Sequence, residues 1–182
     1  MKHALTVFAT LLLLIVPIQA QRSVSSDGVA LATIGRPVSL DSGESTSAAL
    51  AKIEHRTFEL INEKRSENGL PSLKWNDELA NVARFHSRHM AELNFFSHKD
   101  PDGLMVNDRA DKFGIHDWRA IGENIAFNRG YADPAAMAIS NWMESRNHRE
   151  NLLSPDWTDS AIGLALASDG SYYFTQVFLL IK

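Results

Sequence analysis

The sequence contains no cysteine among its 182 residues. This absence excludes disulfide bonds, a lipid-anchored cysteine, a thiol nucleophile and a thiolate metal site. A protein without disulfides must be stable through its hydrophobic core alone, and about 135 residues are enough to build one such domain. We therefore expect one folded domain without covalent cross-links.

An excess of basic residues is also lacking. Lysine and arginine number 18 against 22 aspartates and glutamates, which gives a formal net charge of −4. A mildly acidic surface repels phosphate backbones, and the sequence contains no basic stripe of the kind that nucleic-acid binding requires. The composition therefore argues against a nucleic-acid partner.

No hydrophobic run is long enough to favour a membrane-spanning helix. The apolar run at residues 4–16 ends at Pro17, whereas a spanning helix needs about 20 apolar residues. A weakly basic start at Lys2, a short apolar middle and a small residue at Ala20 are typical of a secretory signal peptide. We expect residues 1–20 to be removed, leaving a secreted or periplasmic protein with no stable membrane span. An uncleaved signal anchor is the alternative.

Residues 21–47 are rich in serine, glycine, aspartate and small side chains, with no periodic apolar face. Such a segment cannot bury enough surface to offset the entropy lost on ordering. We expect a flexible tether there, followed by one domain over residues 48–182.

Helix signals recur through this domain. Four stretches have the apolar spacing of amphipathic helices, at about residues 48–68, 77–93, 105–113 and 133–146. Gly69 stands where a left-handed cap would end the first, and Asn76 is a favourable N-cap for the second. Asp133-Pro134 begins the fourth. His86 lies on the apolar stripe of the second helix and is expected to be a hydrogen-bonded core residue.

Strand signals come mainly at the end of the chain. Residues 161–167 and 172–180 are apolar and flank Asp169-Gly170, a dipeptide favoured in hairpin turns. Residues 122–127 are expected to be extended and half-buried, after an irregular segment at 115–120. Helices followed by a hairpin indicate an antiparallel sheet covered by helices, and so an α+β domain.

Three stretches far apart in the chain carry most of the side chains suited to binding or catalysis, at residues 96–103, 122–126 and 142–153. The candidate site residues are His98, Glu123, Glu144, Ser145 and His148. Our hypothesis is that these stretches converge on one cleft.

The order of the motifs resembles the CAP superfamily, named after cysteine-rich secretory proteins, antigen 5 and pathogenesis-related 1 proteins, whose domain is also called the SCP domain. Each motif is weak alone, but the ordered set covers nearly all of residues 53–181 and is most similar to the cysteine-free bacterial branch. The motifs include Asn62–Arg65, Leu70-Pro71, Leu73–Asn76, His86-Ser87, Phe96–His98, Gly122–Ala126, Trp142-Met143, His148-Arg149, Ile162-Gly163 and Tyr173–Phe178.

This resemblance implies an α-β-α sandwich with a central three-stranded antiparallel sheet, and a cleft lined by two histidines and two glutamates. His98 matches the first histidine, Glu123 the first glutamate and His148 the second histidine. The eukaryotic branch has its second glutamate where this sequence has Ser145. Glu144 is one residue earlier, about 100° around the helix. The implied site is therefore a His-Glu-His triad with Ser145 beside it, and with Glu144 as a further candidate.

Two imidazoles from distant segments can share a divalent cation such as zinc, and a carboxylate can fix their tautomers. Firm zinc sites usually have three or four protein ligands. We therefore expect weak, exchangeable zinc at His98 and His148, unless Glu123 also ligates the metal. The alternative is a hydrogen-bond network that only holds loops in place.

These observations favour a secreted binding module, which we expect to be a monomer. Its unknown extracellular or envelope ligand would be a lipid, a sterol-like molecule, a cell-wall fragment or a protein. Four aromatic residues are candidates to line the cleft, although aromatics beside helices and strands are usually core: Phe95, Phe96, Phe127 and Trp142.

The alternative function is a hydrolase acting on peptide, ester or cell-wall substrates. Either a metal would activate water, or Ser145 and His148 would act as nucleophile and base. The sequence contains neither a His-Glu-x-x-His motif nor a Gly-x-Ser-x-Gly elbow. Binding without turnover is therefore favoured.

Overall fold

The computed structural model describes residues 45–182, and the predicted signal peptide and nearly all of the predicted tether lie outside this range. Within it, helices and strands follow in the order α1 (Thr46–Glu67), β1 (Lys74–Trp75), α2 (Asp77–Leu93), α3 (Val106–Lys112), β2 (Trp118–Asn128), α4 (Pro134–Glu144), α5 (Arg146–Leu152), β3 (Asp159–Leu166) and β4 (Tyr172–Ile181). The α+β class predicted from the sequence is confirmed.

Local sequence signals account for most of the helix ends. Asn76 accepts hydrogen bonds from the main-chain nitrogens of Glu78 and Leu79, so it caps α2 as predicted. Asp133 caps α4 through Ala136 N, with proline at the first helical position. Gly69 adopts a left-handed φ of 70° after α1.

The sheet has four strands in the order β1-β3-β4-β2. Strands β2, β4 and β3 are antiparallel, in agreement with the implied three-stranded sheet, and the two-residue β1 adds a short parallel strand beside β3. Strand β2 begins at Trp118, where its pairing with Ile181 of β4 starts. The prediction of an irregular segment at 115–120 was therefore wrong for residues 118–120. Strand β2 is an outer strand of the sheet.

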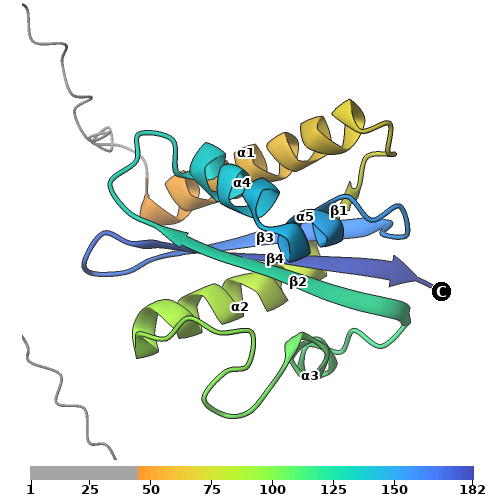
Figure 1. Ribbon diagram of the computed structural model, residues 1–182. Coiled ribbons are helices and arrows are strands. Elements are labelled where there is room, and N and C mark those ends of the chain that lie inside the picture. The colour runs from red at the N-terminus through yellow and green to blue at the C-terminus, as the bar shows by residue number, and fades with distance from the viewer. Residues whose placement is uncertain (1–44) are drawn as a thin grey trace, which may run out of the picture. The chain divides into compact units, whose positions relative to one another are not determined.

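Helices cover both faces of the sheet, as Figure 1 shows: α1, α4 and α5 lie on one side, and α2 and α3 on the other. Each side has its own buried cluster. One includes Ile61, Trp142, Ile162, Phe174 and Phe178. The other includes Leu79, Val82, Ala110, Val177 and Leu179. The sheet therefore forms the middle layer of an α-β-α sandwich.

Helix α2 crosses β3 at Gly163. A Cβ atom built on this glycine would lie 2.0 Å from Arg84 N and 2.2 Å from the Ala83 carbonyl carbon. Main chain meets main chain at this point, so only glycine allows α2 to pack this closely on the sheet.

In residues 45–182, every helix is too short or too polar to cross a membrane.

Candidate functional site

His98 and Glu123 meet although they lie 25 positions apart in the sequence. Their hydrogen bond joins His98 Nδ1 to Glu123 Oε1 at 2.9 Å. His98 lies in the loop after α2, and Glu123 lies in the outer strand β2. The histidine side chain is 42% exposed and the glutamate side chain 4% exposed, so a buried carboxylate holds a partly exposed ring.

Arg109 of α3 holds both residues. Its Nη2 donates to Glu123 Oε2 at 2.6 Å, and its Nη1 donates to the carbonyl oxygens of His98 and Leu104 at 3.1 and 2.8 Å. The arginine side chain is fully buried. Both carboxylate oxygens of Glu123 are therefore engaged, one by the imidazole and one by the guanidinium.

This arrangement sets the tautomer of His98. An ionised carboxylate only accepts hydrogen bonds, so Nδ1 must donate to Glu123 and Nε2 of the neutral ring keeps its lone pair. That lone pair is what a metal ion or a hydroxyl donor would use. Glu123 thus orients the histidine.

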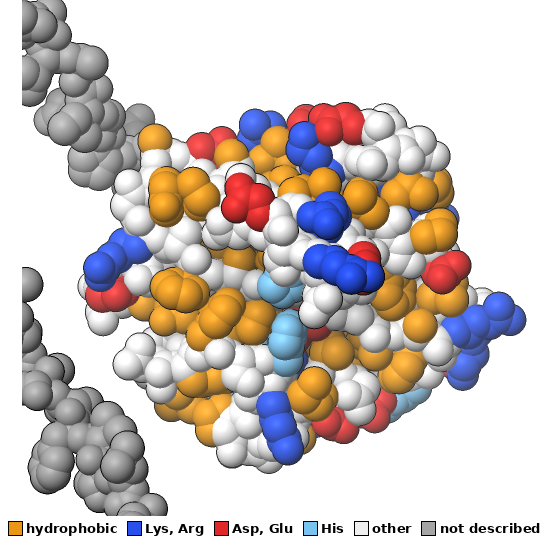
Figure 2. All heavy atoms as spheres, in the orientation of Figure 1, with side chains coloured by type: hydrophobic (Ala, Val, Ile, Leu, Met, Phe, Trp, Pro, Cys, Tyr) orange, Lys and Arg blue, Asp and Glu red, His pale blue; other side chains and the backbone are white. Residues whose placement is uncertain are grey.

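His148 approaches from the opposite side of the sheet, on α5. The ring centroids of His98 and His148 are 6.5 Å apart, with their planes inclined by 49°. Asn124 Nδ2 donates to the His148 carbonyl oxygen at 3.1 Å, and Asn151 Nδ2 donates to the carbonyl oxygen of Glu123 at 3.2 Å. These two asparagines attach α5 to strand β2. Figure 2 shows histidine side chains, in pale blue, near the middle of this face of the molecule.

Burial lowers the pKa of His148, and the neighbouring His98 lowers it further. Within residues 45–182, the ring nitrogens of His148 have no hydrogen-bond partner. A neutral imidazole with a free lone pair is the form that binds a metal. The lowered pKa of His148 therefore favours the form of this ring that presents an acceptor nitrogen.

The outer edge of β2 is covered by side chains from α4 and α5. Trp142 Nε1 donates to the Ile125 carbonyl oxygen at 3.0 Å, and the tryptophan is fully buried. Together with the bond from Asn151 to Glu123, this contact satisfies carbonyl groups that an outer strand would otherwise leave unpaired. Trp142 therefore belongs to the core, and it helps to fix strand β2, which carries Glu123.

Among the described residues, neither Glu144 nor Ser145 makes a hydrogen bond to the side chain of His98 or His148. Glu144 is exposed at the end of α4 and accepts a hydrogen bond from Ser140 Oγ. Ser145 separates α4 from α5 with an extended ψ of 121°, so the prediction of one helix running to residue 146 was wrong. Among the described residues, Ser145 Oγ has no hydrogen bond to His148.

Two imidazole nitrogens form the donor set that a metal would meet here. The described residues contain no group of three histidines, aspartates or glutamates arranged to hold a metal ion. Glu123, predicted as a third ligand, has both its oxygens occupied by His98 and Arg109. A cation about 2.0–2.1 Å from a ring nitrogen lies about 3.2 Å from the ring centroid, so two rings that share one at the tetrahedral angle have centroids about 5 Å apart. The observed 6.5 Å requires the two rings to move closer together.

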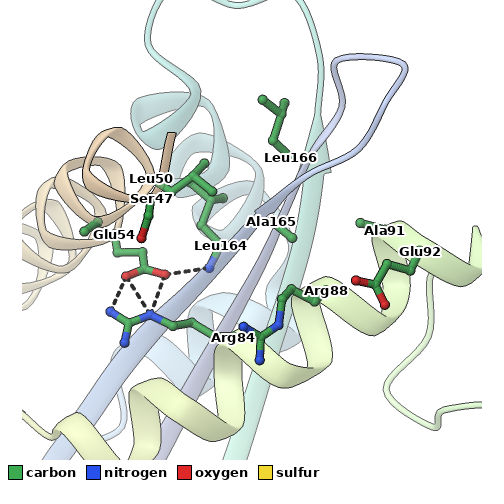
Figure 3. Close-up of a pocket in the computed structure, with 11 residues that line it drawn as sticks. Ser47, Leu50, Glu54, Arg84, Arg88, Ala91, Glu92, Leu164, Ala165 and Leu166 are labelled. Carbon is green, nitrogen blue, oxygen red and sulfur yellow. Dashed lines mark hydrogen bonds and ion pairs between the residues drawn. The ribbon is translucent and has the colours of Figure 1, made fainter. Parts of the chain in front are cut away.

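A separate hollow of about 530 Å³ lies between α1 and α2 (Figure 3). Glu54, which is 2% exposed, accepts hydrogen bonds from Arg84 and from the main-chain nitrogen of Leu164 there. This ion pair joins α1, α2 and β3. It lies apart from the histidine pair and serves the packing of the sandwich.

Sequence reasoning missed the roles of Arg109, Asn124 and Asn151. Arg109 lies on the apolar stripe of α3 with Val106 and Ala110. A charged residue on such a stripe is a sequence signal that could have predicted a buried ion pair. No local pattern indicated that the two asparagines would bridge β2 and α5.

Residues 58–178 match the family described as CAP, the cysteine-rich secretory protein family. The chain belongs to the CAP family. The resemblance read from the sequence motifs is thereby confirmed. One similar protein is described as the uncharacterized membrane protein YlbC of Bacillus subtilis, 38% identical over 126 residues, which cover 69% of this chain and 34% of YlbC.

A second relative is the uncharacterized protein YkwD of the same organism, 33% identical over 135 residues, covering 74% of this chain and 50% of YkwD. The chain thus spans a third to a half of the length of these relatives. Among solved structures, an extracellular SCP-domain protein from Bacillus anthracis is 31% identical with a TM-score of 0.64, covering 76% of this chain and 45% of that one. The CAP domain is therefore shared, within proteins of different overall length.

Proposed function

We propose that the domain is an extracellular binding module whose histidine pair holds a divalent cation such as zinc weakly. One observation carries the proposal: the rings of His98 and His148, from opposite sides of the sheet, have centroids 6.5 Å apart. His98 is already oriented by Glu123 and Arg109. A metal would therefore meet one prearranged ligand and one ring free to adjust.

Weak binding follows from the number of ligands. Two nitrogens are fewer than the three or four protein ligands of firm zinc sites. The remaining coordination positions would be filled by water or by a donor atom of an extracellular ligand. Bound zinc would polarise such a donor atom. His98 and His148 would hold the metal, and Glu123 would act indirectly by orienting His98.

Export supports the same proposal. The apolar run at residues 4–16 is typical of a signal peptide, and the similar Bacillus anthracis protein is described as extracellular. We infer that this chain also acts outside the cytoplasm, on a ligand of the cell envelope or its surroundings.

The hydrolase alternative has less support from the geometry. Ser145 begins α5 without a bond to His148 in the described chain. Glu123 accepts hydrogen bonds from His98 and Arg109, which favours a role in orienting His98 over a role as general base. The proposed function is accordingly binding without turnover.

The test is calorimetric titration of zinc chloride into the untagged full chain. We expect heat of binding that disappears in His98→Ala and in His148→Ala. His116→Ala is the matched control, because His116 is an exposed histidine with a 64% exposed side chain. Heat that persists unchanged in both site variants would refute the metal site.

Activity assays separate binding from catalysis. We expect no zinc-dependent hydrolysis of peptide, ester or peptidoglycan substrates. Zinc-dependent turnover that Glu123→Ala abolishes would replace the binding module by the hydrolase. If the His98→Ala and His148→Ala chains differ from the parent only in thermal stability, the histidines are structural.

A further inference from the structure

A second hollow, of about 600 Å³, lies where β2 ends and the β3–β4 hairpin turns. Its lining includes the rings of Phe127, Tyr131 and Tyr173 and the polar side chains of Asn94, Arg129 and Asp169. None of these residues belongs to the histidine site. The hollow is therefore a separate candidate for ligand binding.

The aromatic rings form an exposed row. Phe127 and Tyr173 are register partners on β2 and β4, and their rings stack at 5.9 Å with an angle of 23°. Phe96 packs edge-on against Phe127 at 5.1 Å. Phe96, Phe127 and Tyr131 are 46%, 51% and 51% exposed. Large rings exposed together usually mark a contact surface.

The exposure has a structural cause. Helix α2, which covers this face of the sheet, stops at Leu93, and Asn94 turns the chain away with a left-handed φ of 51°. The last residues of β2 therefore extend beyond the helix that would bury them. Phe127 is therefore 51% exposed, and Tyr173, which is partly buried, stacks against it.

The polar lining is electrically balanced. Arg129 and Asp169 form an ion pair of 3.1 Å with each other, and hydrogen bonds from Ser171 lower the pKa of Asp169, as does Arg129. The other polar lining groups are neutral, the amides of three asparagines and the hydroxyl of Ser171. A phosphate or carboxylate ligand would find no uncompensated cation, and a lipid tail would find amides instead of apolar walls.

We propose that this hollow binds an uncharged glycan chain. The C–H face of a sugar ring carries a weak positive charge and fits the negative face of an aromatic ring. Amide and hydroxyl groups donate to and accept from sugar hydroxyls. A sugar has both a C–H face and many hydroxyl groups, so it can use the aromatic rings and the neutral groups that both donate and accept hydrogen bonds. The rings of Tyr173, Phe127 and Phe96 follow one another in contact, which would allow more than one sugar unit to bind.

The test is a titration of the full chain with three soluble hexasaccharides: β-1,4-linked glucose, β-1,4-linked N-acetylglucosamine and β-1,4-linked mannose, followed by calorimetry. At least one should bind saturably, and Phe127→Ala and Tyr131→Ala should each raise the Kd about tenfold. Phe113→Ala is the matched control, since Phe113 is 43% exposed but lies at the end of α3.

Saturation with none of the hexasaccharides up to millimolar concentrations would overturn the proposal. So would equal binding by the parent and both ring variants, or binding to phosphatidylcholine vesicles that the ring variants lose. Excess chelator should leave glycan binding unchanged, because the hollow does not include His98 or His148. The glycan site and the metal site can therefore fail independently.

Discussion

Arg109 and Glu123 form an ion pair of 2.6 Å in which the arginine side chain is fully buried and the glutamate side chain is 4% exposed. Buried charges are stable only when paired, because removal of one partner leaves the other without solvation. Both members of the pair also bind His98: Glu123 accepts a hydrogen bond from its Nδ1, and Arg109 donates one to its carbonyl oxygen. The partly exposed histidine ring therefore depends on an ion pair that is almost completely buried.

Arg109→Ala should lower the free energy of unfolding by about 3–5 kcal/mol, because it leaves Glu123 buried and unpaired. Adding Glu123→Gln to Arg109→Ala should recover part of the loss, since the amide needs no counter-charge. Urea denaturation of both variants measures the difference. A loss below about 1 kcal/mol in Arg109→Ala would mean that water already solvates the carboxylate.

Stability should fall as the pH is lowered from 7 to 5. Burial lowers the pKa of His86, which is fully buried, and of His148. Over the range below the ordinary histidine pKa of about 6.5, the unfolded chain then binds more protons than the folded chain. The stability that the two neutral rings supply is present above that pH and is lost as pH falls toward their folded pKa values.

Denaturation midpoints measured between pH 7 and 5 check this expectation. His86→Gln should flatten the decline most, because desolvation is strongest at this ring, and His148→Gln should flatten it less. His116→Gln, at an exposed histidine, should leave the slope unchanged. A slope that is the same in all four chains would assign the decline to other groups.

Gly163→Ala should destabilise the domain by about 3 kcal/mol or more, because the new methyl group would meet the main chain of α2 at 2.0–2.6 Å. Gly170→Ala is the control: its φ is 85°, but no atom lies within 4 Å. That change should cost only about 1–2 kcal/mol, from the left-handed backbone alone. Equal effects on the melting temperature would show that α2 can move away from β3.

Trp142→Ala should cost about 3–5 kcal/mol, since it removes a fully buried aromatic side chain. Trp142→Phe should cost less, because it keeps most of the packing and loses the hydrogen bond to the Ile125 carbonyl oxygen. Chemical denaturation gives both values. If the two variants are equally unstable, the hydrogen bond to strand β2 carries most of the effect of Trp142.

Much of the fold is predictable from the sequence because its signals are local. Asn76 and Asp133 cap helices at the predicted positions, and Asp169-Gly170 lies between the paired strands β3 and β4. His86 is buried on the apolar stripe of α2 and contacts the Ser97 carbonyl oxygen at 3.0 Å, as a core histidine should. Each of these predictions depends on a few neighbouring residues.

The break between α4 and α5 shows where such reasoning ends. The helix predicted over about residues 133–146 ends at Glu144, and Ser145 is extended between it and α5, which is attached to β2 through Asn151. The consequence reaches the candidate site, because Ser145 and His148 no longer share one helix. The contact between Asn151 and Glu123 joins residues 28 positions apart, and local spacing does not predict such contacts.

By itself, the amino-acid sequence determined the class of the fold, the ends of most helices, the hairpin and the three stretches that carry His98, Glu123 and His148. Only the tertiary structure decided that Glu123 is held by Arg109, that Ser145 is extended between α4 and α5, and that Phe127 remains exposed beyond the end of α2. The physical reason is that spacing and capping act over one or two helical turns, whereas buried ion pairs and exposed faces depend on which distant segments the sheet brings together.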